Sequence, residues 1–270
     1  MSRMPDIVIF GLAMSSSWGN GHATTYRALV RGLAEAGRHV LFLERDVEWY
    51  RANRDMPDPD FCELRLYSDF DDLQAKLPGL GAAERVLVGS YVPDGALLID
   101  RLMSRRPPCI AFYDIDTPVT LASLQKGPMP WLRADQLAMF DACFSFTGGP
   151  ALRDLERRWG ARKAFALHCS VDPELYHPQE APHRWDLGYM GTWSEDRQPA
   201  LERLLLEPAR KLPHLRFVVA GPQYPADVRW PENVERIEHL EPSRHREFYC
   251  SQRYTLNLTR ADMVRAGWSP

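Results

Sequence analysis

The chain has 270 residues, with 33 Lys and Arg against 36 Asp and Glu, and a formal net charge of -3 at pH 7. Its length suits two α/β domains, each with its own hydrophobic core. The charges are nearly balanced, and the sequence contains neither a long basic block nor a basic stripe interleaved with aromatic residues. Nucleic acid is therefore not expected as a principal partner.

The first residues lead directly into a short apolar run at 7–10, which polar turn residues follow. This run is too short for a signal peptide or an integral membrane segment, so we expect a cytoplasmic protein. The five cysteines form no C-x-x-C pair, which argues against a zinc knuckle or a disulfide framework. We expect reduced and mostly buried thiols at Cys62, Cys109, Cys143, Cys169 and Cys250.

Residues 14–25 lie between the apolar run at 7–10 and a helix-patterned segment at 26–36. This order predicts a strand-to-helix turn at the head of an α/β domain, where such folds bind ligands. Gly19 and Gly21 let the backbone approach a bound group, and the N–H groups of the following helix favour an anion such as a phosphate. The alternative is a glycine-rich turn that only serves a tight bend.

His22 lies at the start of this predicted helix. The positive end of the helix dipole disfavours an imidazolium there, so we expect a neutral ring that can accept a proton. The alternative is a histidine with a purely structural place in the turn.

The helix pattern ends at Gly37, and the apolar run 40–43 follows. A strand, a helix and a strand in this order predict parallel pairing with a right-handed crossover, and hence a doubly wound sheet. Glu44 ends the second strand, where a dinucleotide fold places its ribose-binding acid. It could equally be a solvated strand end.

The same alternation continues to His168. Pro93, at a favourable first-turn position, opens a helix that runs through Leu102. We expect further strands at 64–67, 85–89, 109–113, 142–146 and 163–167, and further helices through Leu73 and from 148–150 to Gly160. These elements predict a first Rossmann-like domain at 1–168.

Residues 169–185 are rich in Pro, His and acidic side chains and have no apolar period, which is typical of a linker. A second Rossmann-like domain is predicted at 186–270. Its strands are expected at 186–190, 215–220, around Val234 and at 254–258, and its helices around 201–209 and Arg246. A complete domain of this kind would have further strand and helix units, so we expect this one to be incomplete.

Four stretches, taken in order, resemble the two-domain glycosyltransferases of the GT-B fold, in particular the bacterial spore-maturation-like or family 4-like group. Residues 169–178 are similar to the linker phrase of that family, G-V-D-x-x-x-F/Y-x-P. The other stretches are the turn at 16–22, the strand and glycine at 187–193, and the strand and turn at 217–222. Together they cover most of the chain.

The resemblance implies a nucleotide-sugar donor, UDP- or GDP-linked, held mainly by the second domain. It further implies a small-molecule or glycan acceptor held by the first domain, chemistry in the cleft between them, and no cofactor or metal. In this family an acidic helix motif beyond the equivalent of residues 267–270 completes the donor pocket. On this basis we expect a truncated transferase.

The leaving nucleoside diphosphate must be stabilised as its negative charge develops. The resemblance implies that Arg197, after the Gly191 turn, faces this diphosphate; alternatively it is a solvent-facing helix arginine. Thr192 either donates its hydroxyl to the donor or caps the helix. Arg260 beside Thr259 could equally point to solvent. The predicted donor and phosphate-binding set is Gly19, Asn20, Gly21, Gly191, Thr192, Arg197, Gly221 and Thr259, and His22 is the predicted base for the acceptor.

Asp114 and Asp116 suggest a rival mechanism. Two carboxylates spaced by one residue could hold a divalent cation, as in the Asp-x-Asp transferases of the GT-A fold. Against this, Thr117-Pro118 after Asp116 fits a helix cap. The tryptophans Trp18, Trp193 and Trp268 lie beside turns and would either stack on sugar rings or pack.

Two other functions fit the same architecture. One is a non-catalytic nucleotide- or sugar-binding module that kept the cleft, and the other is a different enzyme such as a nucleotide-sugar epimerase.

Overall fold

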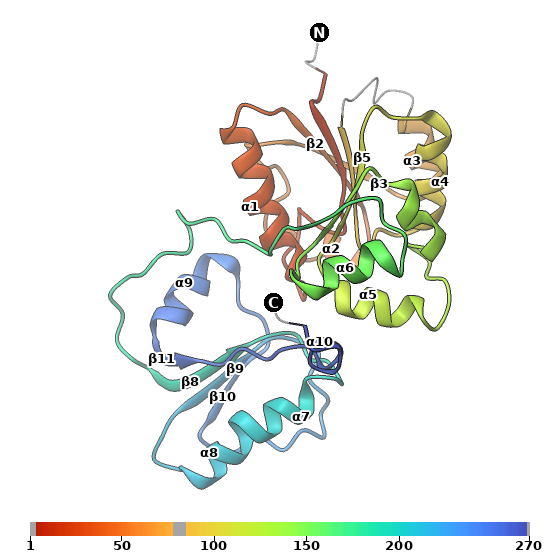
Figure 1. Cartoon of the computed structure of the whole chain (residues 1–270). Coiled ribbons are helices and arrows are strands. Elements are labelled where there is room, and N and C mark those ends of the chain that lie inside the picture. The colour runs from red at the N-terminus through yellow and green to blue at the C-terminus, as the bar shows by residue number, and fades with distance from the viewer. Residues whose placement is uncertain (1–3, 78–84, 269–270) are drawn as a thin grey trace. The chain divides into compact units, whose positions relative to one another are not determined.

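The structure is a computed structural model and describes residues 4–77 and 85–268. The chain divides into two compact units, drawn in Figure 1. The first consists of Met1–Ser17, His22–Val171 and Asp262–Pro270, and the second of Trp18–Gly21 and Asp172–Ala261. The resemblance to the glycosyltransferase family used residues 267–270 as a reference point. Residues 269 and 270 lie outside the part that the structure describes.

The first unit contains a seven-stranded sheet in the order β3-β2-β1-β4-β5-β6-β7, in which all described pairs are parallel. The predicted α/β fold with parallel pairing is therefore confirmed. The strand order reverses between β1 and β4, which is where ligands bind in open α/β sheets. The elements are β1 (Ile7–Phe10), α1 (His22–Glu35), β2 (Val40–Arg45), α2 (Glu48–Arg51), β3 (Glu63–Tyr67), α3 (Phe70–Lys76), β4 (Arg85–Gly89), α4 (Gly95–Arg105), β5 (Ile110–Asp114), α5 (Thr117–Leu124), the 3-10 helix η2 (Ala134–Met139), β6 (Ala142–Ser145), α6 (Pro150–Arg157) and β7 (Ala164–Ala166).

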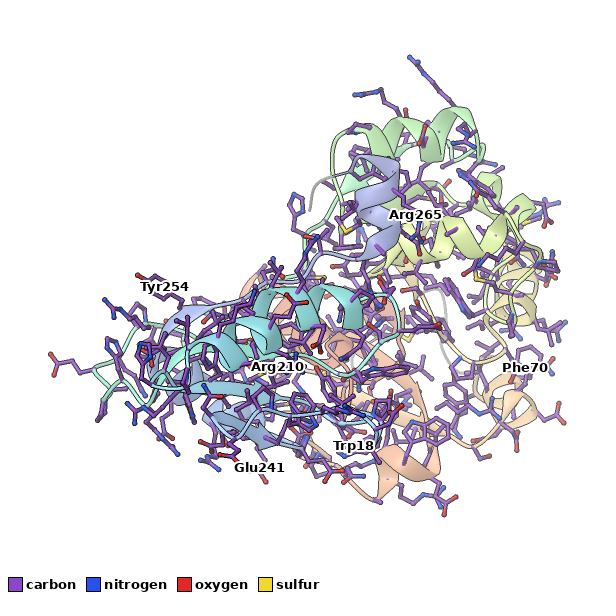
Figure 2. The ribbon with its side chains drawn as sticks, turned by 90° about the horizontal axis from the view of Figure 1, so that it is seen from below. Trp18, Phe70, Arg210, Glu241, Tyr254 and Arg265 are labelled. Atoms are coloured by element: carbon purple, nitrogen blue, oxygen red, sulfur yellow. The ribbon has the colours of Figure 1, made fainter. Side chains whose placement is uncertain are left out.

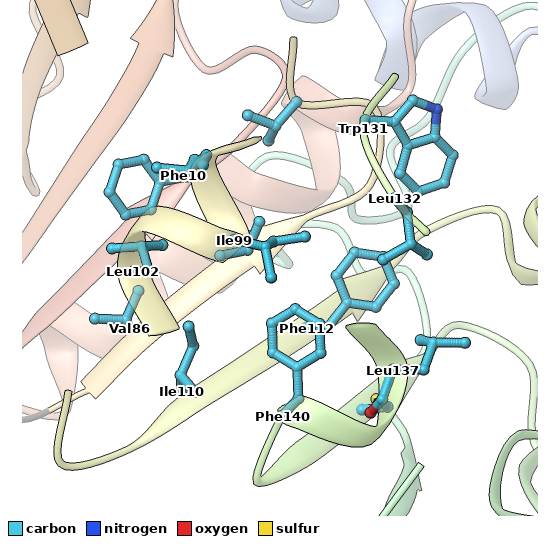
Figure 3. Close-up of a cluster of buried hydrophobic side chains, with 14 of the residues drawn as sticks. Phe10, Val86, Ile99, Leu102, Ile110, Phe112, Trp131, Leu132, Leu137 and Phe140 are labelled. Carbon is cyan, nitrogen blue, oxygen red and sulfur yellow. The ribbon is translucent and has the colours of Figure 1, made fainter. Parts of the chain in front are cut away.

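Helices cover both faces of this sheet, with α1 on one face and α3 and α4 on the other (Figure 1). Because side chains alternate along a strand, β1 serves both layers. Ile9 packs with Tyr26 and Val30 of α1. Phe10 belongs to the opposite layer, in which Phe112 stacks on Phe140 with ring centroids 5.4 Å apart (Figure 3). This double burial explains why the strands read as continuous apolar runs.

The second unit contains a four-stranded parallel sheet in the order β10-β9-β8-β11. This order repeats that of the first four strands of the first sheet. A continuous helical run at 198–211 and helix α9 bury opposite faces of it. The elements are β8 (Trp185–Met190), α7 (Gln198–Leu201), the π-helical turn η3 (Glu202–Leu206), α8 (Glu207–Lys211), β9 (Phe217–Ala220), β10 (Val234–Ile237), α9 (Pro242–Cys250) and β11 (Gln252–Thr255). Helix α10 (Ala261–Ala266) follows, and from Asp262 on it belongs to the first unit.

Several local predictions need correction. Helix α1 begins at His22, as predicted for this residue, and so starts before the patterned segment at 26–36; it ends where predicted, with Gly37 at φ +75°. Pro93 precedes helix α4, whose N-cap is the left-handed Asp94, so it does not occupy the first turn. The last strand of the second unit ends at Thr255 rather than Leu258.

The cysteines are all free thiols, but the expectation of mostly buried thiols is wrong. Only Cys143 is fully buried, Cys169 is exposed, and the other three are half-buried. Among the described residues no helix is long and apolar enough to cross a membrane.

Candidate functional site

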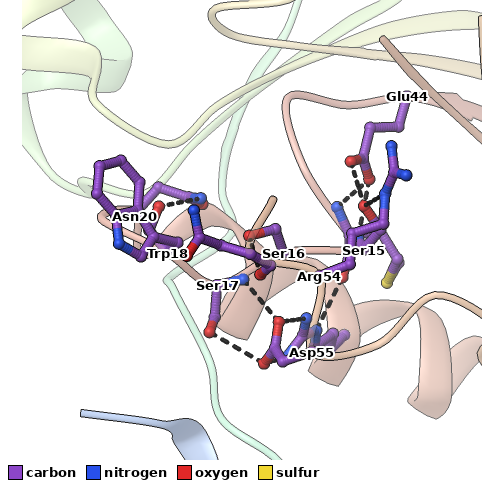
Figure 4. A network of polar contacts seen from close by, with 11 residues as sticks. Ser15, Ser16, Ser17, Trp18, Asn20, Glu44, Arg54 and Asp55 are labelled. Carbon is purple, nitrogen blue, oxygen red and sulfur yellow. Dashed lines mark hydrogen bonds and ion pairs between the residues drawn. The ribbon is translucent and has the colours of Figure 1, made fainter. Parts of the chain in front are cut away.

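Glu44, at the end of strand β2, holds the turn between β1 and α1 in place. The Glu44 side chain is fully buried, and its carboxylate accepts hydrogen bonds from Met14 N (2.6 Å), Ser15 N (2.8 Å) and Ser15 Oγ (2.6 Å) (Figure 4). A solvated strand end is thus excluded. Both carboxylate oxygens are engaged by the chain itself, which leaves the predicted ribose role without support.

A second carboxylate holds the next part of the same turn. Asp55 forms a two-pronged ion pair with Arg27 of α1, with N···O distances of 2.9 and 2.8 Å, and accepts bonds from Ser17 N and Oγ (Figure 4). Burial opposes ionisation, but the hydrogen bonds and charge of Arg27 hold the pKa of Asp55 below its ordinary value. The turn is therefore a rigid, buttressed feature rather than a loose loop.

His22, the predicted base, is the first residue of α1 and is half-buried. Its ring lies edge-on to Tyr91, with centroids 5.5 Å apart, and 6.4 Å from the ring of Tyr26. Tyr91 belongs to the loop after β4, so the two rings meet where the strand order reverses. Tyr91 has φ +63°, an unfavourable conformation for an aromatic residue that is found mainly at functional sites.

Asp114 and Asp116 differ in their surroundings. Asp114 is buried, and its Oδ1 accepts bonds from Asp116 N (3.0 Å) and Thr120 Oγ1 (2.9 Å). Burial raises the pKa of this carboxyl to about 7. Asp116 takes the N-cap position of α5, but its side chain makes no capping bond and instead accepts a bond from Tyr91 Oη at 3.2 Å. The predicted cap position before Thr117-Pro118 is therefore confirmed, but the Asp116 side chain does not make the capping bond.

The part of the chain that the structure describes contains no group of three His, Cys, Asp or Glu side chains able to hold a metal ion. The Asp-x-Asp pair also lacks the character of a metal clamp, because such a clamp requires two ionised carboxylates directed at the ion. One of the two, Asp114, is directed into the protein.

Residues Trp18–Gly21 have most of their contacts with the second unit. Gly19 adopts φ +65°, which explains glycine at this position, and its carbonyl accepts a bond from Thr192 Oγ1 at 3.0 Å. A Cβ on Gly21 would meet nothing within 4 Å. Asn20 bonds locally to Trp18 O at 3.3 Å.

The turns after β8 and β9 touch each other through their glycines. A Cβ on Gly191 would lie 2.4 Å from Tyr189 Oη, and one on Gly221 would lie 2.1 Å from the carbonyl oxygen of Gly191. Gly221 also has φ +139°. Internal packing therefore requires both glycines, whatever they contact outside the protein.

Arg197 takes the N-cap position of α7, at the start of its helix as predicted. It lines a pocket of the second unit with Thr192, Trp193 and Tyr224, a pocket too narrow for a water molecule. Its Nε is buried and has no partner among the described residues. Thr192 lies too far before α7 to cap it, so the capping alternative is wrong and its hydroxyl serves Gly19 instead.

The loop after β11 contacts the turn after β8 through Asp196. The Asp196 carboxylate pairs with Arg260 at 3.2 Å and accepts a bond from Ala261 N at 3.2 Å. Arg260 therefore does not simply point to solvent. Burial opposes ionisation, but the charge of Arg260 and the bond from Ala261 N lower the pKa of Asp196. Thr259, the predicted donor contact, is exposed.

The three predicted tryptophans have different places. Trp268 packs against the core of the first unit, as its packing alternative proposed. Trp193 is half-buried, and its Nε1 has no described partner. Trp18 lies beside Asn20 in the turn (Figure 4).

Comparisons with known proteins concern the fold. Residues 197–270 match the model of a glycosyl transferase-like family. An alpha-glucosyltransferase in complex with UDP and a 13-mer DNA containing an HMU base superposes with a TM-score of 0.66 at 12% identity, covering 93% of this chain and 72% of that one. The chain has a glycosyltransferase fold.

Two further solved structures share this glycosyltransferase fold. A trehalose-6-phosphate protein from E. coli bound with UDP-2-fluoro glucose gives a TM-score of 0.60 at 13% identity, covering 94% of this chain and 78% of that one. The catalytic domain of starch synthase IV from Arabidopsis thaliana, bound to ADP and acarbose, gives 0.62 at 9% identity, with coverages of 91% and 76%. A search of curated proteins finds no match to this sequence.

Sequence reasoning missed several residues of these sites. Tyr91, Asp196 and Tyr224 were not singled out. A tyrosine or arginine in a loop or edge strand carries no periodic signal. One available hint was the placement of Tyr91 two residues after Gly89, the end of the predicted strand at 85–89.

Proposed function

We propose that the protein transfers a sugar from a nucleotide-sugar donor to an acceptor hydroxyl without a metal ion, and that it belongs to the spore-maturation-like group of GT-B glycosyltransferases. The donor is UDP- or GDP-linked, and the acceptor is a small molecule or a glycan. The glycosyl transferase-like match over 197–270, together with the shared fold, supports the reaction class.

The observation that carries the proposal is the turn from Gly191 to Arg197. It follows the carboxyl end of β8 in a parallel sheet, where α/β folds bind ligands. The backbone N–H of Thr192 donates to no described protein atom, and Arg197 forms no described ion pair. An amide with no described protein partner and a guanidinium with no described ion pair together suit a diphosphate, whose charge grows as the sugar leaves.

The proposed reaction displaces the nucleoside diphosphate from the anomeric carbon. The acceptor oxygen forms a bond to this carbon, the bond from carbon to phosphate oxygen breaks, and its electron pair leaves with the diphosphate. The hydroxyl proton passes to His22, whose place at the start of α1 favours a neutral ring. Tyr91 holds the ring edge-on.

Nucleotide binding tests the donor half of this proposal. We expect calorimetry with UDP, GDP and ADP to show binding by the wild-type chain, and Arg197→Ala to weaken it at least tenfold, because a charge-assisted contact is lost. Arg203→Ala, an exposed arginine of the same helical run, is the matched control and should bind normally. Absence of binding of all three nucleotides would refute the proposal.

Turnover tests the acceptor half. Release of nucleoside diphosphate from a nucleotide-sugar, in the presence of a panel of sugar and small-molecule acceptors, should fall by about 10²-fold or more in His22→Ala. The exposed His214→Ala is the control. Normal turnover in His22→Ala would end its role as base, and nucleotide binding without turnover for any acceptor would favour a binding module.

A further inference from the structure

Two side chains that the proposed reaction does not use hold the donor turns from inside the second unit. Tyr224 Oη donates to the carbonyl of Gly191 at 3.1 Å. Arg236 Nη2 donates to the carbonyl of Gly221 at 2.9 Å, and its Nη1 donates to Val219 O. The carbonyls of both glycines are thus bound by groups of the same unit.

The two side chains also contact each other. Arg236, from β10, places its guanidinium 4.3 Å from the ring centroid of Tyr224 and 4.4 Å from that of Trp230, so it lies against two aromatic faces. Burial lowers the pKa of this guanidinium from its ordinary value. Within the described residues no carboxylate forms an ion pair with this guanidinium, which contacts two rings and two carbonyls, and the charge of Glu238 partly offsets the effect of burial.

The Gly191 bond has a geometric consequence for its neighbour. A trans peptide unit is planar, so the carbonyl of Gly191 and the N–H of Thr192 point in opposite directions. When Tyr224 fixes the carbonyl, it also fixes the direction of that N–H. The N–H is the one that donates to no described protein atom.

Arg236 acts on the same peptide unit, between Gly191 and Thr192, through Gly221. The Gly221 α-carbon packs so closely on the carbonyl of Gly191 that a Cβ there would lie 2.1 Å from this oxygen. Gly221 N is held in turn by Ile237 O at 2.8 Å. Any movement of Gly221 therefore displaces the carbonyl to which Tyr224 bonds.

We propose that Tyr224 and Arg236 are positioning residues that aim the Thr192 amide at the donor diphosphate. The inference rests on the proposed function and adds two residues to it. Neither residue touches the substrate in this scheme; they fix the peptide unit that does. Preorganised donors of this kind bind an anion without reorganisation.

Tyr224→Phe is the sharpest test, because it removes one hydroxyl and keeps the ring under Arg236. We expect its Kd to rise about tenfold for whichever of UDP, GDP and ADP binds wild type best, with unchanged affinity for the corresponding nucleoside. The control is Tyr254→Phe on β11, whose side chain is 64% exposed at the margin of the unit (Figure 2). Arg236→Lys should weaken diphosphate binding similarly, since an ammonium cannot fork between two carbonyls.

Amide hydrogen exchange reports the positioning directly. In Tyr224→Phe the amides of Gly191 and Trp193, which bond to Ala220 O and Pro222 O, should exchange faster than in wild type, while those of β10 remain unchanged. Wild-type binding with equal diphosphate affinity in Tyr224→Phe would overturn this inference and leave the proposed function standing. Equal loss of diphosphate and nucleoside binding would also overturn it, because that pattern indicates a general structural defect. Failure of the wild type to bind any nucleotide would overturn both.

Discussion

Glu44 binds Ser15 twice, accepting the backbone N–H at 2.8 Å through one carboxylate oxygen and the hydroxyl at 2.6 Å through the other. The two residues are 29 positions apart in the sequence and are both fully buried. The pair ties the end of β2 to the turn that leads to His22. Glu44 is thus a structural residue that holds this turn in place.

The first prediction concerns this tie. Glu44→Ala should lower the free energy of unfolding by roughly 3 kcal/mol, because two backbone N–H groups lose a buried, charged acceptor. Glu44→Gln, which keeps one acceptor oxygen, should cost about half as much. Denaturant unfolding measures both. Glu35→Ala, at an exposed position of α1, is the control, and an equal effect there would contradict the argument.

The second prediction concerns pH and Asp114. Its folded pKa of about 7 lies above the ordinary carboxyl value, so the folded state keeps a proton that the unfolded state loses as pH rises above about 4. Stability from this group is therefore complete at low pH and is lost as pH rises to about 7, at roughly 1.4 kcal/mol per pH unit.

Asp114→Asn removes this titration. Unfolding free energies measured from pH 5 to pH 9 should fall less steeply with pH in the variant than in wild type up to about pH 8, and the two profiles should run parallel above it. Parallel profiles over the whole range would show that Asp114 does not titrate there.

The third prediction concerns Gly89 and Tyr26. A Cβ on Gly89 would lie 1.9 Å from Tyr26 Oη, so Gly89→Ala should lower the unfolding free energy by roughly 2–3 kcal/mol. The buried Tyr26 hydroxyl has no described partner, so Tyr26→Phe alone should be neutral or slightly stabilising. In the Tyr26→Phe background Gly89→Ala should cost less. A double-mutant cycle by denaturant unfolding measures this coupling, and strict additivity would exclude the clash.

The fourth prediction separates the two kinds of predicted donor glycine. Gly221→Ala should lower the unfolding free energy by roughly 3 kcal/mol or more, because of its φ of +139° and the contact with Gly191 O. Gly21→Ala, which faces open space, should change it by no more than roughly 0.5 kcal/mol. Thermal and denaturant unfolding compare the two. Because Gly21→Ala should fold normally, its nucleotide affinity isolates the predicted phosphate contact.

The sequence by itself determined the elements and their pairing. Apolar runs such as 7–10 and 85–89 coincide with β1 and β4, because a strand buried on both faces must be apolar throughout. Gly37 ended α1 as expected, since only glycine takes a left-handed conformation there without strain. Alternating strands and helices then left parallel pairing as the expected topology. All of these are local signals.

Tertiary structure decided what the polar residues do. Glu44, Asp116 and Thr192 each took a partner that local sequence did not indicate, at separations of 29, 25 and 173 residues. Tyr224 and Arg236 can bond to Gly191 and Gly221 only because β8, β9 and β10 lie side by side. A hydrogen bond requires a distance and an angle between groups, and over such separations these are set only when the chain has folded.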